Sequence, residues 1–340
     1  MNATRKSEII NAMPSFSKER YPKSELLPEL FKLQSELVDL TFNGDHAENA
    51  QLKIWDVYNH LAKLNEVNGH VADDMLEKFW CGCKTVNESI RGEISGNRGE
   101  YKAFRSLETV HTAKIVLQNI ELCSGDHRTE LDLIVFTEKA VFILEVKNPT
   151  MDVVIDERGN YCRARDGKLS FDKNVGERMN DKDFLLRQVL QAAGIENPNI
   201  VNLMVFTNNN IQVTNMFPYI QHCFLSSLPH LIDCYEGEVL YSQETISKMV
   251  EATEAAKCPE SYPLPLDIVE FKQDFANLMV ALEGASEEPG DEEPVQPEHP
   301  GTVAVDIPFW SKIAKVTAAV IPVFGVAALA AFGISKAVKG

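Results

Sequence analysis

The chain has 340 residues and a formal net charge of -17, with 33 Lys and Arg against 50 Asp and Glu. An acidic surface repels nucleic acid at long range, so this composition excludes a protein coated with phosphate-binding side chains. The 7 cysteines have no regular spacing and the first residues contain no apolar segment, which predicts a reducing, cytosolic setting for the folded part.

Residues 1–95 are expected to form a helical region. Apolar residues recur at helical spacing in three segments between residues 24 and 91, which predicts three helices. We expect these helices to pack on the core or to bind a protein partner rather than to carry chemistry. Cys81 and Cys83 have no companion pair at zinc-site spacing, so the sequence does not favour a metal site there.

The pattern changes at Gly96. A helix over 99–107 is followed by short apolar runs typical of strands, then by a helix over 183–193 and two further strands. This order predicts an α/β core over 96–240, with a mixed central sheet flanked by helices. Two more helices, within residues 241–283, are expected to pack on this core.

The C-terminal part differs in composition. Residues 284–310 are rich in Pro and acidic side chains and predict a flexible linker. The segment between Lys315 and Lys336 is uncharged and has the length, roughly 20 residues, that a helix needs to cross the hydrocarbon core. Residues 311–338 are therefore expected to form a transmembrane helix. The lipid bilayer would be a partner, and the protein would be single-pass with its folded domain on the cytoplasmic side.

A buried or interfacial helix is the alternative for this segment, because Pro322 and Gly325 would kink a helix. An acidic linker before it gives such a helix no evident core to join, which favours the membrane.

A β-hairpin is expected over residues 130–147, where two apolar runs flank a short polar turn. With an even-numbered turn, Phe136 faces Val141 and Asp132 faces Glu145. Two opposed carboxylates repel each other unless a cation lies between them, and partial burial increases this repulsion. Mg2+ suits the position, because one or two carboxylates bind it while its waters give way to a substrate phosphate.

Lys147 lies two residues after Glu145, so both side chains should share one face of the strand. There the amine could orient or deprotonate a metal-bound water, or neutralise charge in a transition state. An exposed hairpin end in which Lys147 pairs with Glu130 is an equal alternative at this point.

The combination of Asp132 with Glu145-Val146-Lys147 resembles the core motif of the PD-(D/E)xK nuclease superfamily. Upstream "SGNRGE" (95–100) and downstream "LLRQ" (185–188) make the chain resemble the nuclease-related (NERD) domain in particular, over about residues 96–235.

This resemblance implies a restriction-endonuclease-like fold and a Mg2+- or Mn2+-dependent nuclease acting on DNA or RNA. It implies that Asp132, Glu145 and Glu100 hold the metal, that Lys147 acts on the attacking water, and that Gln188 positions substrate or water. The chain departs from the family pattern at Leu133, Lys139, Pro149 and Thr150. These changes, with the acidic charge, keep open a catalytically silent module that binds nucleic acid or a protein partner.

Three basic residues, Arg98, Lys102 and Arg105, recur at helical spacing beside Glu100. They are expected to follow a phosphate backbone, and a solvated helix face is the competing interpretation.

Overall fold

The computed structural model describes the chain in five stretches, residues 2–14, 20–42, 51–125, 127–165 and 168–285. The expected transmembrane helix, and all but the first two residues of the expected linker, lie outside these stretches. Within them, no helix is both long enough and apolar enough to span a bilayer.

One hydrophobic core is built from helices alone. Leu30, Leu33 and Leu37 recur on one side of their helix and are fully buried, as the apolar spacing predicts. The helices of this core are α1 (Asn2–Ala12), α2 (Lys23–Phe42), α4 (Ile54–Val67), the first part of α5 (Asp73–Leu107) and α9 (Ile268–Ala285). Two short antiparallel strands, β1 (Arg20–Tyr21) and β11 (Tyr262–Pro263), join the segments that lead into α2 and α9.

Helix α5 is continuous, whereas the sequence suggested separate helices on either side of Gly96. Phe79 on α5 is buried in the helical core, and Ala103 on the same helix is buried against the central sheet. A helical glycine costs about 1 kcal/mol relative to alanine, so glycines in a sequence argue for a break. Here Gly99 has a packing reason, since a Cβ at this position would lie 3.1 Å from Cβ of Asn148. Burial in two cores outweighs the propensity cost.

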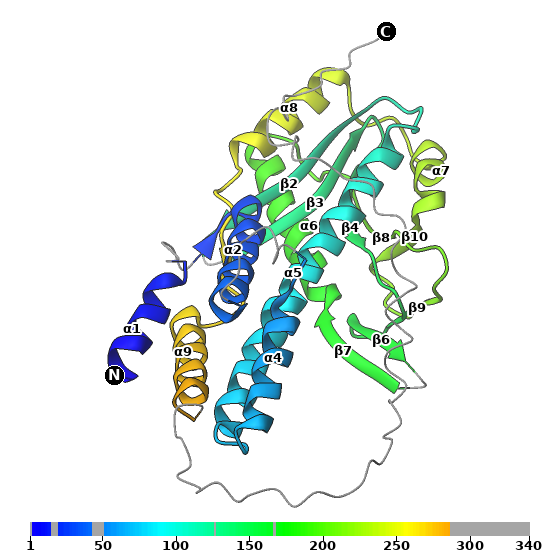
Figure 1. Cartoon of the computed structure of the whole chain (residues 1–340). Coiled ribbons are helices and arrows are strands. Elements are labelled where there is room, and N and C mark those ends of the chain that lie inside the picture. Colours follow the sequence, from blue (N-terminus) through cyan, green and yellow to red (C-terminus); the bar gives the residue numbers. More distant parts are fainter. Residues whose placement is uncertain (1, 15–19, 43–50, 126, 166–167, 286–340) are drawn as a thin grey trace, which may run out of the picture. The chain divides into compact units, whose positions relative to one another are not determined.

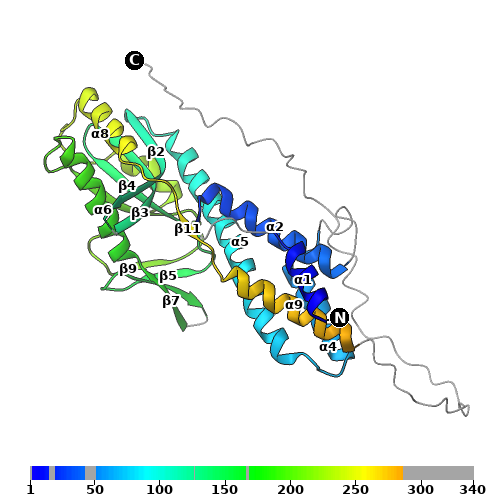
Figure 2. The same ribbon diagram turned by 90° about the vertical axis from the view of Figure 1, so that its left-hand side faces the viewer.

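The central sheet is mixed, as expected, with strand order β10-β8-β4-β3-β2. Strands β2, β3 and β4 are antiparallel neighbours, while β4, β8 and β10 run parallel. Figure 2 shows α5 on one side of this sheet and α6 and α8 on the other. The strands are β2 (Lys114–Ser124), β3 (His127–Thr137), β4 (Val141–Lys147), β8 (Ile200–Phe206) and β10 (Gln221–Phe224).

Both faces of the central sheet are apolar because helices cover both. Ile134 and Ile143 belong to the core on the side of α6 and α8, whereas Leu133 and Leu144 belong to the core on the side of α5. The covering helices are α6 (Val175–Ala192), α7 (Leu228–Asp233) and α8 (Gln243–Ala255), with a 3-10 turn, η1 (Leu225–Ser227), before α7. Thus α8 packs on the sheet, while α9 packs among the N-terminal helices (Figure 1).

A second sheet has the order β7-β6-β5-β9. The hairpin between β5 and β6 turns at Gly159, whose φ of 79° favours glycine. The outer strand β7 escapes prediction because five of its seven residues are exposed, which leaves no alternation of buried and exposed positions. The strands are β5 (Asp152–Ile155), β6 (Asn160–Arg165), β7 (Lys168–Asn174) and β9 (Val213–Asn215).

Helix α6 begins at Val175, two turns before the expected start at Asp183. The side chain of Asn174 accepts a hydrogen bond from the backbone N–H of Glu177 at 2.8 Å, which caps the helix. The extra turns are largely polar and give little apolar periodicity. They carry Lys182 on the buried stripe of the helix, with Met179 and Leu186 on either side.

Candidate active site

The hairpin of β3 and β4 has the expected register. Phe136 pairs with Val141 and Ile134 with Ile143, and the ladder ends where Leu133 meets Leu144. Beyond this pair a side chain links the two strands: Oδ2 of Asp132 on β3 accepts a hydrogen bond from the N–H of Val146 on β4 at 2.8 Å. The carboxylate of Asp132 is thereby fixed against β4.

Asp132 and Glu145 meet at one cation, the ammonium of Lys182 on α6. Its Nζ lies 3.3 Å from Oδ1 of Asp132 and also contacts Oε2 of Glu145. Only 1% of Lys182 and 3% of Glu145 are exposed, so water screens these charges weakly. The two negatively charged carboxylates therefore share a cation, which their mutual repulsion requires. That cation is a side chain of the protein itself, Lys182.

Lys147 donates to the other oxygen of Glu145, Oε1, and not to Glu130. Burial alone would raise the pKa of Glu145, but the nearby ammonium groups of Lys147 and Lys182 hold it well below the usual range. Burial alone would lower the pKa of Lys182, but Asp132 and Glu145 raise it. Glu145 is therefore ionised and Lys182 protonated at neutral pH.

A second carboxylate pair lies at Glu100 and Glu130. Lys23, from the first turn of α2, lies 3.0 Å from Oε1 of Glu100 and 3.1 Å from Oε1 of Glu130. Burial raises the pKa of Glu100, the charge of Lys23 opposes this, and the charge of Asp132 adds to it. Glu100 thus lies within the electrostatic influence of Asp132, but its carboxylate is bound by a lysine of the helical region.

The donor set can be compared with the needs of a divalent cation. Asp132 Oδ1 and Glu145 Oε2 reach a common cation, and two carboxylates with water and phosphate oxygens suit Mg2+. In this respect the residues fit the ion, with the Lys182 ammonium as its stand-in. Across the described stretches, no group of three or more His, Cys, Asp or Glu side chains is placed to hold a metal by itself.

Positive charge accumulates beside Lys147. Lys173, at the end of β7, is partly buried, and its pKa is lowered to about 8 by burial and then by the charges of Lys147 and Arg178. Its ammonium makes no hydrogen bond or ion pair with any residue that the structure describes. The charges of Glu145 and Asp172 act in the opposite direction, but neither forms an ion pair with Lys173, so its ammonium is available to pair with an anion such as a phosphate.

Sequence reasoning missed Lys173, Arg178, Lys182 and Lys23. A signal existed for Lys182, which interrupts the apolar stripe Val175, Met179, Leu186 and Leu190 once the start of α6 is known. The pairing of Lys23 with Glu100 is a tertiary contact between distant segments and leaves no local pattern.

The predicted phosphate-binding residues lie on the exposed side of α5. Arg98, Lys102 and Arg105 are all exposed, and Arg105 donates to Glu108 at 2.7 Å. The structure does not bring them into contact with Asp132 or Glu145. Their binding of nucleic acid stays a prediction.

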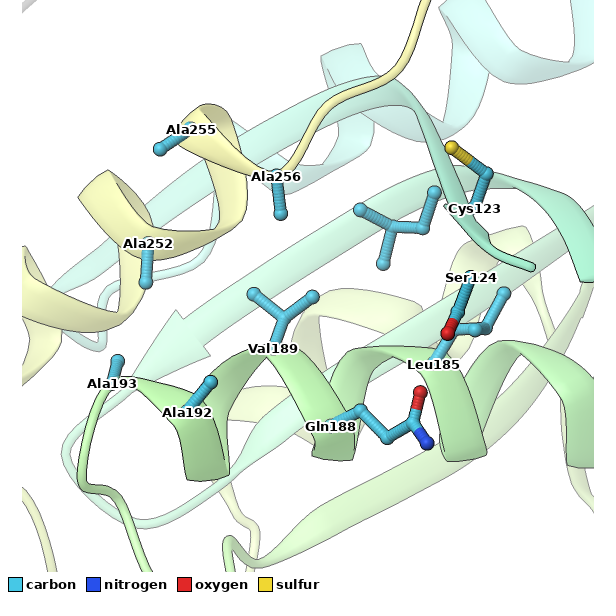
Figure 3. A pocket seen from close by; sticks show the side chains of 11 residues that line it. Cys123, Ser124, Leu185, Gln188, Val189, Ala192, Ala193, Ala252, Ala255 and Ala256 are labelled. Carbon is cyan, nitrogen blue, oxygen red and sulfur yellow. The ribbon is translucent and has the colours of Figure 1, made fainter.

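Gln188 lies away from the carboxylate pair. It lines a pocket of about 500 Å³ between α6, α8 and the end of β2, together with Cys123, Ser124 and several alanines. Figure 3 shows Gln188 beside Val189 and Leu185 on α6, with Ala252 on α8 and Ala256 directly after α8 opposite. Gln188 is six residues, more than one and a half turns, beyond Lys182, so the two side chains leave the helix in different directions.

Residues 95–207 match the family model described as nuclease-related domain. Comparison with curated proteins and with solved structures found no match. The matched segment includes the end of α5 and runs through β8, and it therefore contains Glu100, Asp132, Glu145, Lys147 and Lys182. Over residues 95–207 the chain is therefore similar to the nuclease-related (NERD) domain family.

Proposed function

We propose that the nuclease-related domain hydrolyses phosphodiester bonds of nucleic acid with a divalent cation, Mg2+ or Mn2+, held by Asp132 and Glu145. The observation that carries the proposal is the convergence of one oxygen from each carboxylate on a single cation position beside Lys147. Membrane tethering through residues 311–338, with the domain on the cytoplasmic side, belongs to the same proposal and rests on the sequence.

The roles of the side chains follow from their contacts. A divalent cation supplies a water of lowered pKa and neutralises charge on the phosphate. Lys147, held by Glu145, keeps an ammonium where the attacking water or the transition-state charge would lie. Lys173 and Arg178 attract the phosphate to this end of the sheet.

Glu100 and Gln188 would act on the metal or the substrate less directly than Asp132 and Glu145. Glu100 would complete the site through water, because Lys23 binds its carboxylate directly. Gln188 would contact a distal part of the substrate, since it lines the pocket between α6 and α8. The DNA or RNA strand would continue along Arg98, Lys102 and Arg105 on α5.

A second function is favoured by one specific observation. The ammonium of Lys182 lies where the two carboxylates would hold a metal, so the site is charge-compensated without one. This supports a catalytically silent module that binds nucleic acid, or a protein partner of the N-terminal helices, without cutting.

Cleavage assays separate the two functions. The full chain is incubated with single- and double-stranded DNA and RNA, with and without Mg2+ or Mn2+, as wild type, Asp132→Asn and Asp233→Asn. Asp233 is a matched control because its carboxylate only accepts hydrogen bonds in the loop at His111 and Thr112. Metal-dependent cleavage lost only in Asp132→Asn supports the nuclease. Cleavage that survives Asp132→Asn would exclude the Asp132–Glu145 pair as the catalytic site. Tight binding of nucleic acid without cleavage supports the silent module.

A further inference from the structure

Each carboxylate of the Asp132–Glu145 pair has one oxygen engaged within the hairpin. Oδ2 of Asp132 accepts from the N–H of Val146, and Oε1 of Glu145 accepts from Lys147. The remaining oxygens, Oδ1 and Oε2, both turn to the Lys182 ammonium. A cation that both carboxylates share must therefore lie between Oδ1 of Asp132 and Oε2 of Glu145. The Lys182 ammonium occupies this position.

The charges at this position are balanced. Asp132 and Glu145 carry two negative charges, and Lys147 and Lys182 carry two positive charges, in a region where Glu145 and Lys182 are almost fully buried. An additional divalent cation would meet two ammonium groups at short range and with little solvent screening. A metal cannot simply be added to this cluster at low free-energy cost.

We propose that Lys182 is the resident cation of the site, and that a divalent cation binds Asp132 and Glu145 only by exchanging with the Lys182 ammonium. This inference rests on the proposed function. It makes metal binding by the protein alone weak, because the ion must displace an intramolecular competitor. A phosphate of bound nucleic acid favours the exchange, since it offers the displaced ammonium a charged partner.

The first test measures Mn2+ binding directly, from the electron paramagnetic resonance signal of free Mn2+ titrated with the full chain. Lys182→Met keeps the length of the side chain and removes its charge. It should bind one Mn2+ at least about tenfold more tightly than wild type, which corresponds to one decade in Kd. The gain should disappear in Lys182→Met/Glu145→Gln.

Lys272→Met is the matched control. Lys272 is also buried, but it donates to the backbone carbonyl of Met13 at 3.1 Å in the helical core. Its replacement removes a buried ammonium without freeing a carboxylate pair, so Mn2+ affinity should equal that of wild type.

Lys182→Met leaves two buried carboxylates without their shared partner and is expected to fold less well. The second measurement uses this effect. Mn2+ should raise the melting temperature of Lys182→Met and of the milder Lys182→Gln, and should leave that of wild type nearly unchanged. Recovery of a poorly folded variant with Mn2+ but not with Na+ supports the exchange.

Two results overturn the inference. One is equal Mn2+ affinity, within about a factor of two, in wild type and Lys182→Met. The other is no Mn2+ binding and no Mn2+-dependent stabilisation in either Lys182 variant. Both results concern Mn2+ binding alone, whereas the nuclease function is judged by cleavage in the wild type, so failure of one is distinguishable from failure of the other.

Discussion

Lys23 and Glu100 form an ion pair between the helical region and the segment that matches the nuclease-related domain, with Nζ 3.0 Å from Oε1. Both side chains are 16% exposed, so the pair is partly shielded from water. Although burial alone would lower the pKa of Lys23, Glu130 and Glu100 raise it. The helical region therefore compensates charge that the domain's own residues leave unbalanced.

Removing Lys23 should destabilise the protein. In Lys23→Met, Glu100 and Glu130 lose their shared cation, and we expect the free energy of unfolding to fall by about 2 kcal/mol, between the values typical of exposed and buried pairs. Urea unfolding measures this change. Lys32→Met, an exposed position on the same helix, is the control and should alter stability by less than about 0.5 kcal/mol. Equal effects of the two substitutions would contradict the compensation by Lys23.

Glu145 should make the free energy of unfolding depend on pH in the acidic range. Burial raises its pKa, but Lys147 and Lys182 dominate and hold it well below the ordinary 4.5. The stabilisation is therefore fully present above about pH 4.5 and is lost as the pH falls toward the folded-state pKa. Unfolding of wild type and Glu145→Gln across pH 3–6 checks this: the two stability curves should converge toward low pH. Parallel curves would show that Glu145 is not held ionised by its neighbours.

Lys173 should make the free energy of unfolding depend on pH in the alkaline range. Its pKa is lowered from 10.5 to about 8 by burial, Lys147 and Arg178, so the unfolded chain holds a proton that the folded chain has lost between these values. The free energy of unfolding should therefore rise with pH across this window, because the unfolded state binds more protons. In Lys173→Met this contribution disappears. Denaturant unfolding of both proteins at the two ends of the window measures the difference, and identical pH profiles would refute it.

Gly99 should tolerate substitution poorly, in contrast to Gly92 on the same helix. A Cβ on Gly99 would lie 3.1 Å from Cβ of Asn148, whereas a Cβ on Gly92 would meet nothing within 4 Å. Gly92→Ala should stabilise the protein by about 0.5–1 kcal/mol through helix propensity. Gly99→Leu should destabilise it by about 1–3 kcal/mol through overpacking against Asn148. Thermal unfolding of the two variants gives the sign of each change, and a stabilising Gly99→Leu would show that α5 can shift away from β4.

Nucleic-acid binding along α5 has a distinct salt signature. Removing Arg98 and Lys102 together should weaken binding to all sequences alike and reduce the slope of log affinity against log salt by about 2, one for each lost phosphate contact. Fluorescence anisotropy at several salt concentrations measures the slope. Lys78→Met, exposed on the same helix but in the helical core region, is the control. An unchanged slope in the double variant would leave these residues as a solvated helix face.

The sequence predicts the parts of the fold that depend on local patterns. The four-residue turn over 137–140 determines the β3–β4 register, and the spacing of Leu27, Leu30 and Leu37 predicts α2. It fails where tertiary packing outweighs local preference. Gly99 suggests a helix break, but its missing side chain lets α5 pass beside Asn148.

The candidate site shows the same division. Opposed carboxylates at Asp132 and Glu145 predict that a cation lies between them, because like charges repel at any distance the sheet allows. The sequence does not say that the cation is Lys182. That lysine lies in polar turns of α6 whose helical start depends on the cap at Asn174, and only packing against the sheet directs its ammonium to the pair.

The continuity of α5 has a consequence for how this module can be exchanged between proteins. Residues 95–207 begin inside a helix whose earlier turns bury Phe79 and Cys83 in another core, and they omit both Lys23 and the whole of α8. A segment cut at the family boundaries would expose the apolar side of the sheet that α8 covers, and would leave Glu100 beside Glu130 with no counter-charge. In this chain, the structural unit that recombination could transfer intact is therefore larger than the matched segment 95–207.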